Sequence, residues 1–345
     1  MASIRQFLQS FSMFNGITAR VTTEREQHIP KMRSSSPQVE VYVADILDIY
    51  GELSARSDLS PCQTVNTLFG RLVNICIQTL PHATTQQILE DPRILEILSP
   101  LRVICATAEC HLESYWADKI NSAEDVYTAL TDFPYYGNYV DLTRMELAAL
   151  YSVEPTTPRR IAFIGSGPLP LTSMCLCLQL ENNERSYKPS STLISPPPSP
   201  SPSDDERGTI VVNIDRNQEA ITQSSALCSN LGQKFRGMRF SCEEAGTAET
   251  DLKEFDVVYL AALVGMTNED KQGILADIVG RMNVGSLLVI RTAHSLRKLL
   301  YPEFDLSTEA VLACLDIEVV VHPYNHVVNS VIVGRVKARS DEGLM

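Results

Sequence analysis

The amino-acid sequence predicts a Rossmann-like, doubly wound α/β domain that follows an all-helical domain. Over residues 39–157, apolar side chains recur at three- and four-residue steps, which is typical of helices packed on a core. After Pro158, short apolar runs alternate with helical stretches, which indicates a mainly parallel sheet covered by helices. The segment 153–159 between the two patterns contains two prolines, each of which disfavours helix at the residue before it. We therefore place the domain boundary here, with the second domain spanning 158–338.

The helical domain shows its apolar spacing most clearly near its start. One such face consists of Val43, Ile46, Leu47, Tyr50 and Leu53. Later helices are expected over 100–120, where Pro100 would lie in the first turn, and over 139–151. The polar residues 1–38 and the last residues 339–345 are predicted to be a flexible extension and a flexible tail.

Six apolar runs of the second domain are predicted to be strands. They span 161–165, 209–215, 255–263, 286–293, 317–322 and 329–336. Between the first two lies 182–208, which is rich in Ser and Pro. Such a segment buries too little apolar surface to offset its ordering entropy, so we predict a disordered insertion on the surface.

Bulk properties narrow the range of partners. The chain has 29 Lys and Arg against 42 Asp and Glu, a net charge of −13 that would repel a phosphate backbone. No run reaches the roughly 20 apolar residues that span a bilayer, and the N-terminus lacks a signal-peptide pattern. We expect a cytoplasmic protein with a small-molecule substrate and neither nucleic acid nor membrane as partner. The sequence predicts no oligomeric state.

The nine cysteines are scattered without CxxC spacing, and we interpret them as reduced, mostly buried thiols. Cys175 and Cys177 raise the possibility of a metal or redox site. They lie two residues apart in a predicted helix, however, and so point to different sides of it. We interpret this pair as core packing and predict no metal site.

A glycine turn follows the first predicted strand. Gly165, Ser166 and Gly167 allow close backbone approach to a ligand, and the helix that follows offers unpaired N–H groups. Two glycines alone are weak evidence, because many turns contain them. Asp215 ends the second strand and, with the insertion removed, lies about 20 positions after the glycines, where an acid binds a ribose diol. Together the turn and the acid predict a site for an adenosine-bearing cofactor.

Two classes of cofactor fit this turn. A dinucleotide favours a third glycine beside its pyrophosphate, and Pro170 stands in that place. S-adenosylmethionine has no phosphate and carries a sulfonium cation, which suits acidic residues near the strand ends. The departure from the glycine pattern therefore favours S-adenosylmethionine and a sheet like that of class I methyltransferases.

Five segments in chain order strongly resemble one family. They are FPYYGNYVDLTRMEL (133–147), FIGSGPLPLTS (163–173), YLAALVGM (259–266), RTAHSLRKLLYP (291–302) and HPYNHVVNSVIV (322–333). The family is nicotianamine synthase, and the resemblance covers about 47–336 without the insertion. The insertion and the N-terminal extension depart from the family's compact form, and we interpret them as features of a fungal-type member.

The resemblance implies an activity. The family condenses three molecules of S-adenosylmethionine by transferring the 3-amino-3-carboxypropyl group, which yields nicotianamine and methylthioadenosine without a metal cofactor. Nicotianamine chelates iron, zinc, nickel and copper, so the implied role is metal homeostasis. Neither the order of the three transfers nor the possibility of a shorter product is decided by the resemblance.

The reaction is attack by an amine on a carbon bonded to sulfonium, so the enzyme must keep the amine neutral and aligned. Glu109 and Glu113 lie one turn apart on a predicted helix and thus on one face, which by itself also fits a solvated surface. The family has a similar AExxLE-like stretch. The resemblance therefore implies that one of the two orients or deprotonates the amine, and we prefer Glu113.

Further candidates lie in the aromatic cluster and after the strand that ends near Arg291. The aromatic cluster before the helix at 139 fits a core as well as a site, and the family match makes Tyr136 a catalytic candidate and Tyr135 and Tyr139 substrate-binding candidates, with rings that can face the sulfonium. Arg291 follows a strand at the ligand-binding edge and could bind a substrate carboxylate through two hydrogen bonds. His294 fits either substrate binding or a hydrogen-bonded place in the core.

The adenine side of the site is expected at two places. Glu244 lies where an acid often meets the adenine amino group. Ala261, Leu263 and Val264 follow a strand and would form the wall beside the adenine.

Two other functions remain open at this point. A methyltransferase with a helical lid would share the glycine turn and Asp215 but release S-adenosylhomocysteine. A non-catalytic interaction protein could keep the fold, although the presence of Glu113, Tyr136 and Arg291 argues against it.

Overall fold

The computed structural model describes residues 36–186, 208–245, 250–265 and 268–338. Most of the expected extension, residues 187–207 of the expected insertion and the expected tail therefore lie outside the described residues. Helix α1 (Pro37–Ser54) begins within the segment expected to be flexible, because Ser36 accepts a hydrogen bond from Val39 N (3.3 Å) and Pro37 occupies the first turn.

Five more helices precede the first strand in the described chain. They are α2 (Gln63–Cys76), α3 (His82–Leu89), α4 (Pro92–Asn121), α5 (Val126–Thr131) and α6 (Tyr136–Val153). The predicted start of a helix at Pro100 is wrong, because Pro100 lies inside α4. Asp91 caps this helix by accepting from Arg93 N (2.9 Å), and Pro92 rather than Pro100 occupies the first turn.

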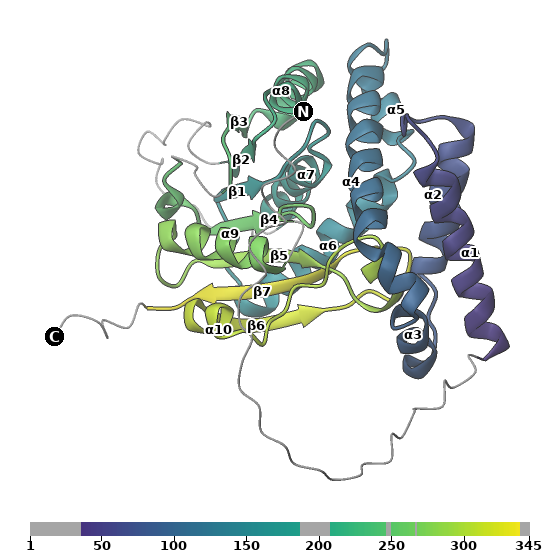
Figure 1. The fold of residues 1–345 in the computed structure, drawn as a ribbon. Helices are drawn as coiled ribbons and strands as arrows, with labels where there is room; N and C mark the ends of the chain where they lie inside the picture. The colour runs from purple at the N-terminus through teal and green to yellow at the C-terminus, as the bar shows by residue number, and fades with distance from the viewer. Residues whose placement is uncertain (1–35, 187–207, 246–249, 266–267, 339–345) are drawn as a thin grey trace, which may run out of the picture. The chain divides into compact units, whose positions relative to one another are not determined.

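The sheet has seven strands within the described residues (Figure 1). They are β1 (Arg160–Ile164), β2 (Ile210–Asp215), β3 (Met238–Cys242), β4 (Val257–Leu260), β5 (Leu287–Thr292), β6 (Leu315–Val321) and β7 (Ser330–Val336). Their order is β3-β2-β1-β4-β5-β7-β6; β7 is antiparallel to both neighbours and the other pairs are parallel. The predicted doubly wound, methyltransferase-like sheet is confirmed. Strand β3 was not predicted, because it lies at the edge of the sheet and has a single buried residue, Met238.

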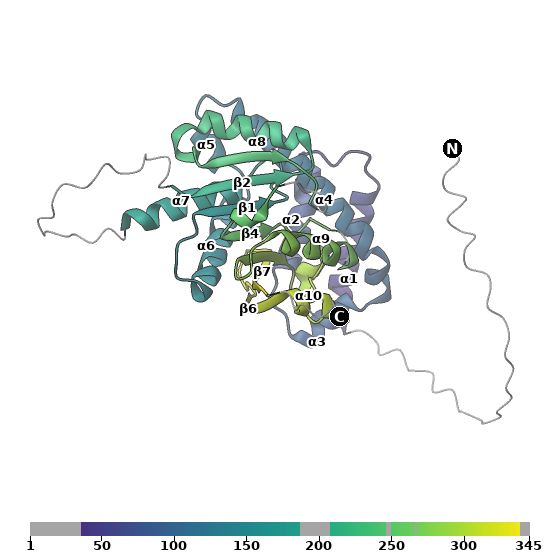
Figure 2. The ribbon, with the colours of Figure 1, turned by 90° about the vertical axis from the view of Figure 1, so that its left-hand side faces the viewer.

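Helices cover both faces of this sheet. The elements after β1 include α7 (Leu171–Ser186), α8 (Gln218–Leu231), α9 (Asn268–Arg281) and α10 (Glu309–Cys314), with short 3-10 helices η2 (Gly232–Phe235), η3 (Leu252–Glu254) and η4 (Ser295–Leu299). Figure 2 shows α6 and α7 on one side of the strands and α9 and α10 on the other. The first five residues of the expected insertion, 182–186, belong to α7.

Side-chain alternation along the strands explains the two cores. In β1, Ile161 and Phe163 pack with α6, α7 and α8, whereas Ala162 and Ile164 pack toward α9 and α10. A third core joins α1 to α4 with η4. Helix α4 contacts both α1 and α8, so its middle turns face the sheet's ligand-binding edge.

We propose that the segments before and after Pro158 are two domains, because the change of secondary structure falls there; the described residues from Ser36 onward form one compact unit. Within the described residues, no helix is long and apolar enough to cross a membrane.

Candidate active site

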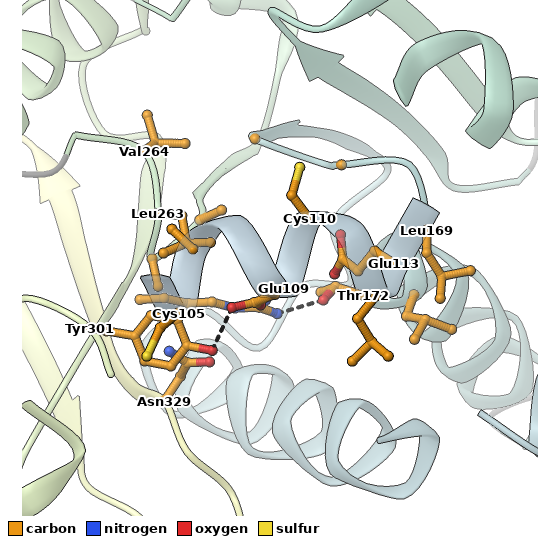
Figure 3. A pocket seen from close by; sticks show the side chains of 18 of the residues that line it. Cys105, Glu109, Cys110, Glu113, Leu169, Thr172, Leu263, Val264, Tyr301 and Asn329 are labelled. Atoms are coloured by element: carbon orange, nitrogen blue, oxygen red, sulfur yellow. Dashed lines mark hydrogen bonds between the residues drawn. The ribbon is translucent and has the colours of Figure 1, made fainter. Parts of the chain in front are cut away.

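A cavity of about 1610 Å³ lies between the carboxyl ends of the parallel strands and helix α4 (Figure 3). Its walls come from segments far apart in the sequence. They include 105–110 and 112–113 of α4, 133–135, 137–139, the glycine turn 163–173, Asp215, the loop 261–265, Arg291, Tyr301 and the segment 326–329 without Val327. Parallel strands bring these loops to one edge of the sheet, where ligands of doubly wound folds bind.

The glycine turn has the tight geometry that the sequence predicted. Gly165 and Gly167 both have positive φ, +81° and +66°. Asp215 Oδ2 accepts a hydrogen bond from Gly167 N (2.9 Å), and its Oδ1 accepts one from Asn217 N (2.9 Å). The acid at the end of β2 thus lies directly against the turn. A carboxylate has about four acceptor positions, so Asp215 can also accept from the two hydroxyls of a ribose.

The two glutamates of α4 face the cavity beside this turn (Figure 3). Tyr139 Oη donates to Glu113 Oε1 and Tyr301 Oη donates to Glu109 Oε2, each at 2.9 Å. Glu113 also lies close to the turn, because a Cβ added to Gly167 would be 2.6 Å from Glu113 Oε2. The predicted acid pair is therefore inside the cavity and not on a solvated helix face.

Charge and burial act together on this acid pair. Burial raises the pKa of both carboxyls, and the neighbouring Glu109 charge raises the pKa of Glu113 further, well above the ordinary 4.5. Because each ionisation disfavours the other, the pair titrates as a unit. Such a pair can accept a proton from an amine and is stabilised when a cation binds next to it.

The tyrosines of the aromatic cluster differ in position. Tyr135 and Tyr139 line the cavity, as a substrate-binding role requires. Tyr136 does not line it: this residue begins α6, and its ring packs on the hydrophobic core. The structure therefore gives no support to a catalytic role for Tyr136, and Tyr139 is the phenol of this cluster that donates to an acid.

Arg291 lies at the cavity wall, but its hydrogen bonds go to the protein. Nε donates to Glu146 Oε1 (2.7 Å), and Nη2 donates to Glu146 Oε2 (3.1 Å) and Thr172 Oγ1 (2.6 Å). Glu146 is completely buried. The pair of hydrogen bonds that was expected to bind a substrate carboxylate is thus made to Glu146, because this buried carboxylate needs a charged partner.

His294 and Glu244, two further predicted site residues, also differ in whether they line the cavity. His294 does not line the cavity; its ring stacks on His322, with centroids 4.1 Å apart and planes 23° apart. Burial lowers the pKa of His294, which favours the neutral imidazole. Glu244 is exposed and lines the cavity.

The loop after β4 lies where the adenine wall was expected. Ala261, Leu263 and Val264 line the cavity next to the glycine turn. A Cβ on Gly165 would lie 2.4 Å from Val264 Cγ2 and 3.1 Å from Ala261 Cβ, so this loop and the turn are in direct contact.

A family model described as "Nicotianamine synthase protein" matches residues 35–340. The chain belongs to the nicotianamine synthase family. Nicotianamine synthase 2 of Oryza sativa subsp. japonica is 32% identical over 309 residues, covering 88% of this chain and 85% of that protein. The probable nicotianamine synthase 4 of Arabidopsis thaliana is 34% identical over 313 residues, covering 89% and 86%. The family predicted from the sequence is confirmed.

Solved structures support the same fold. A variant of MtNAS in complex with S-adenosylmethionine matches with a TM-score of 0.67 and 21% identity, covering 86% of this chain and 99% of that chain. MtNAS in complex with MTA and tNA matches with a TM-score of 0.65 and 20% identity over the same shares of the two chains. Among the described residues of this family member, no group of three or more His, Cys, Asp or Glu is placed to hold a metal ion.

Several residues that shape the cavity were not found from the sequence. Tyr301 donates to Glu109, from which it is 192 residues away in the sequence. Glu146 pairs with Arg291, which is 145 residues away. Lys271 of α9 is fully buried and donates from Nζ to Ala262 O (2.7 Å), and burial lowers its pKa to about 8. It supports the loop that forms the expected adenine wall. Tyr301 lies in the segment 291–302 of the resemblance, and Asn329 begins the apolar run 329–336 that was predicted to be a strand, but neither was predicted to be a site residue.

Gly165→Ala is expected to weaken binding of S-adenosylhomocysteine at least about tenfold, because the new Cβ would meet Val264 in a backbone conformation with positive φ. Isothermal titration calorimetry measures the change. The matched control is Gly51→Ala in α1, where an added Cβ meets nothing within 4 Å. Equal affinity of the two variants would show that the contact between Gly165 and Val264 does not shape the ligand site.

The acid pair predicts that binding of a cationic ligand releases protons. A cation beside Glu109 and Glu113 favours their ionised forms and lowers their raised pKa values. Above pH 4.5, the ordinary pKa of a glutamate, we therefore expect proton release on binding. The release disappears at alkaline pH, where both carboxyls are already ionised in the ligand-free protein.

Calorimetry in buffers of different ionisation enthalpy measures this release. Sinefungin, an unreactive analogue with an ammonium group in place of the sulfonium, is the cationic ligand. S-adenosylhomocysteine, which lacks that cation, is its control and should release fewer protons. Because both ligands carry the amino acid ammonium, equal release would contradict an electrostatic link between the sulfonium position and the acid pair.

Proposed function

We propose that this chain is a nicotianamine synthase, a transferase that converts three molecules of S-adenosylmethionine into nicotianamine and three of methylthioadenosine. The observation that carries this proposal is the placement of Glu113 between Tyr139 and the glycine turn, inside the cavity. It supplies a proton acceptor where the reactive end of S-adenosylmethionine is expected. Family membership supports the same activity.

Each transfer follows from this geometry. The glycine turn and Asp215 bind the adenosine part, and the loop 261–265 borders the adenine. The lone pair of the acceptor amine attacks the γ-carbon, the C–S bond breaks, and its electron pair remains on sulfur as neutral methylthioadenosine leaves. The new C–N bond leaves one proton in excess on nitrogen, and Glu113 accepts it. Because sulfonium is a good leaving group, alignment and a neutral amine suffice.

The size of the cavity fits a reaction between two large substrates. Ligand pockets usually have volumes of roughly 300–1,000 Å³, whereas this cavity has about 1610 Å³. Donor and acceptor can therefore occupy it together. A methyltransferase with a helical lid remains the alternative, since it would use the same turn and Asp215.

Mass spectrometry of products separates the two functions. The purified protein is incubated with S-adenosylmethionine alone. Nicotianamine synthase activity gives methylthioadenosine and nicotianamine in a ratio of three to one. No turnover without an added acceptor, or S-adenosylhomocysteine once one is supplied, would support the methyltransferase instead.

We also propose a role in metal homeostasis and a cytoplasmic location. The support for the first is that nicotianamine chelates iron and zinc. For the second it is the nine cysteines, which are all free thiols, as is usual in a reducing compartment.

A further inference from the structure

Four residues of the cavity wall carry buried polar atoms that have no hydrogen-bond partner in the described structure. They are Asn138 Oδ1, Ser166 Oγ, Ser173 Oγ and Asn329 Nδ2. Buried polar groups in proteins are almost always hydrogen-bonded, since an unpaired one costs about 1–3 kcal/mol. Such atoms at a cavity point to a ligand that completes their bonding.

Asn329 has the most informative position of the four. It lines the same cavity as Tyr301 and Glu109, its side chain is drawn next to theirs in the view of Figure 3, and the residue is only 6% exposed. It directly precedes β7. The segment before it is fixed by buried Arg297, whose Nε donates to Val327 O (2.9 Å) and whose Nη2 donates to Asn325 O (2.6 Å). The amide is therefore presented to the cavity from a well-supported backbone.

The chemistry of the substrate gives this amide a partner. The aminocarboxypropyl group ends in an amino acid head group, with an ammonium or amine and a carboxylate. Glu109 offers an acceptor for the nitrogen, but the carboxylate needs N–H or O–H donors. Arg291 does not provide its two-bond fork, because Glu146 occupies it.

A neutral donor also suits the charge of the site. A Lys or Arg side chain in the place of Asn329 would compete with the sulfonium and the ammonium of the substrate for Glu109 and Glu113. An asparagine donates to a carboxylate without adding positive charge.

We propose that Asn329 and Glu109 form a subsite for the amino acid head group, in which Asn329 Nδ2 donates to the carboxylate and Glu109 accepts from the nitrogen. This inference rests on the proposed function, because it names the part of that substrate which the subsite binds. It separates the two glutamates: Glu109 binds the head group, and Glu113 takes the proton.

Binding of two unreactive ligands tests the subsite without turnover. S-adenosylhomocysteine and methylthioadenosine share the nucleoside and its thioether, but only the first carries the amino acid head group. Asn329→Ala should weaken binding of S-adenosylhomocysteine at least about tenfold and leave methylthioadenosine unchanged, because only one ligand loses a hydrogen bond to a charged group. The matched control is Asn230→Ala, an exposed asparagine on α8 outside the cavity.

Further arms make each outcome decisive. Nicotianamine, which carries the carboxylates of the acceptor, is a third ligand. If Asn329→Ala weakens binding of nicotianamine but not of S-adenosylhomocysteine, Asn329 binds a carboxylate of the acceptor and not that of the donor. Asn329→Ser, which keeps a polar group, replaces the alanine variant if thermal denaturation shows that the latter does not fold. Unchanged affinity for both carboxylate ligands, or an equal loss for methylthioadenosine, overturns the proposal. Failure of the proposed function would instead appear as absence of nicotianamine from the wild-type reaction.

Discussion

Glu113→Gln is expected to reduce turnover at least roughly tenfold, a loss of about 1.4 kcal/mol in transition-state stabilisation. Glutamine keeps the shape of the side chain and its hydrogen bond with Tyr139 Oη, but it cannot accept a proton from the amine. The change should leave binding of S-adenosylhomocysteine within about twofold, since that ligand brings no sulfonium cation.

Release of methylthioadenosine over time measures the effect on turnover. Glu90→Gln is the matched control, because Glu90 is exposed at the end of α3 and does not line the cavity. Glu109→Gln, by contrast, should raise KM more than it lowers kcat if Glu109 binds the head group. Equal turnover of Glu113→Gln and the wild type would remove Glu113 from the mechanism.

Arg291→Met is expected to lower the free energy of unfolding by about 3–5 kcal/mol, which is the usual result of removing one partner of a buried ion pair. Glu146 is completely buried, and without Arg291 its carboxylate keeps no charged partner among the contacts described. Thr172 Oγ1 loses its bond from the guanidinium as well.

Urea denaturation followed by circular dichroism measures this loss. Arg144→Met is the control. Arg144 forms an exposed ion pair with Asp141, three residues earlier on α6, and loss of this pair should cost less than about 1 kcal/mol. The double variant Arg291→Met and Glu146→Leu should recover most of the stability, because no buried charge is left unpaired. If Arg291→Met lost no more stability than Arg144→Met, the buried pair would not hold α6 to the sheet.

The sequence by itself determined the fold class, the family and the cofactor turn. These depend on local patterns: the helical spacing of α1, the apolar runs of six strands, and a glycine turn directly after β1. The closeness of Gly167 and Asp215 also followed from the sequence, because the ends of neighbouring parallel strands lie at one edge of the sheet. Strand β3 was missed because it has only one buried residue. The start of α4 was misplaced because Pro100 was assigned to the first turn, although Asp91 and Pro92 give the same signal earlier in the chain.

Only the tertiary structure decided which side chains meet. Arg291 was predicted to bind substrate but pairs with Glu146, and Tyr136 packs on the core while Tyr139 reaches Glu113. Asn329 was not predicted to be a site residue, because no local sequence pattern shows that its amide lacks a hydrogen-bond partner. The physical reason is common to these cases: a side chain's partner comes from whichever segment the packed core brings against it, and local periodicity carries no information about that contact.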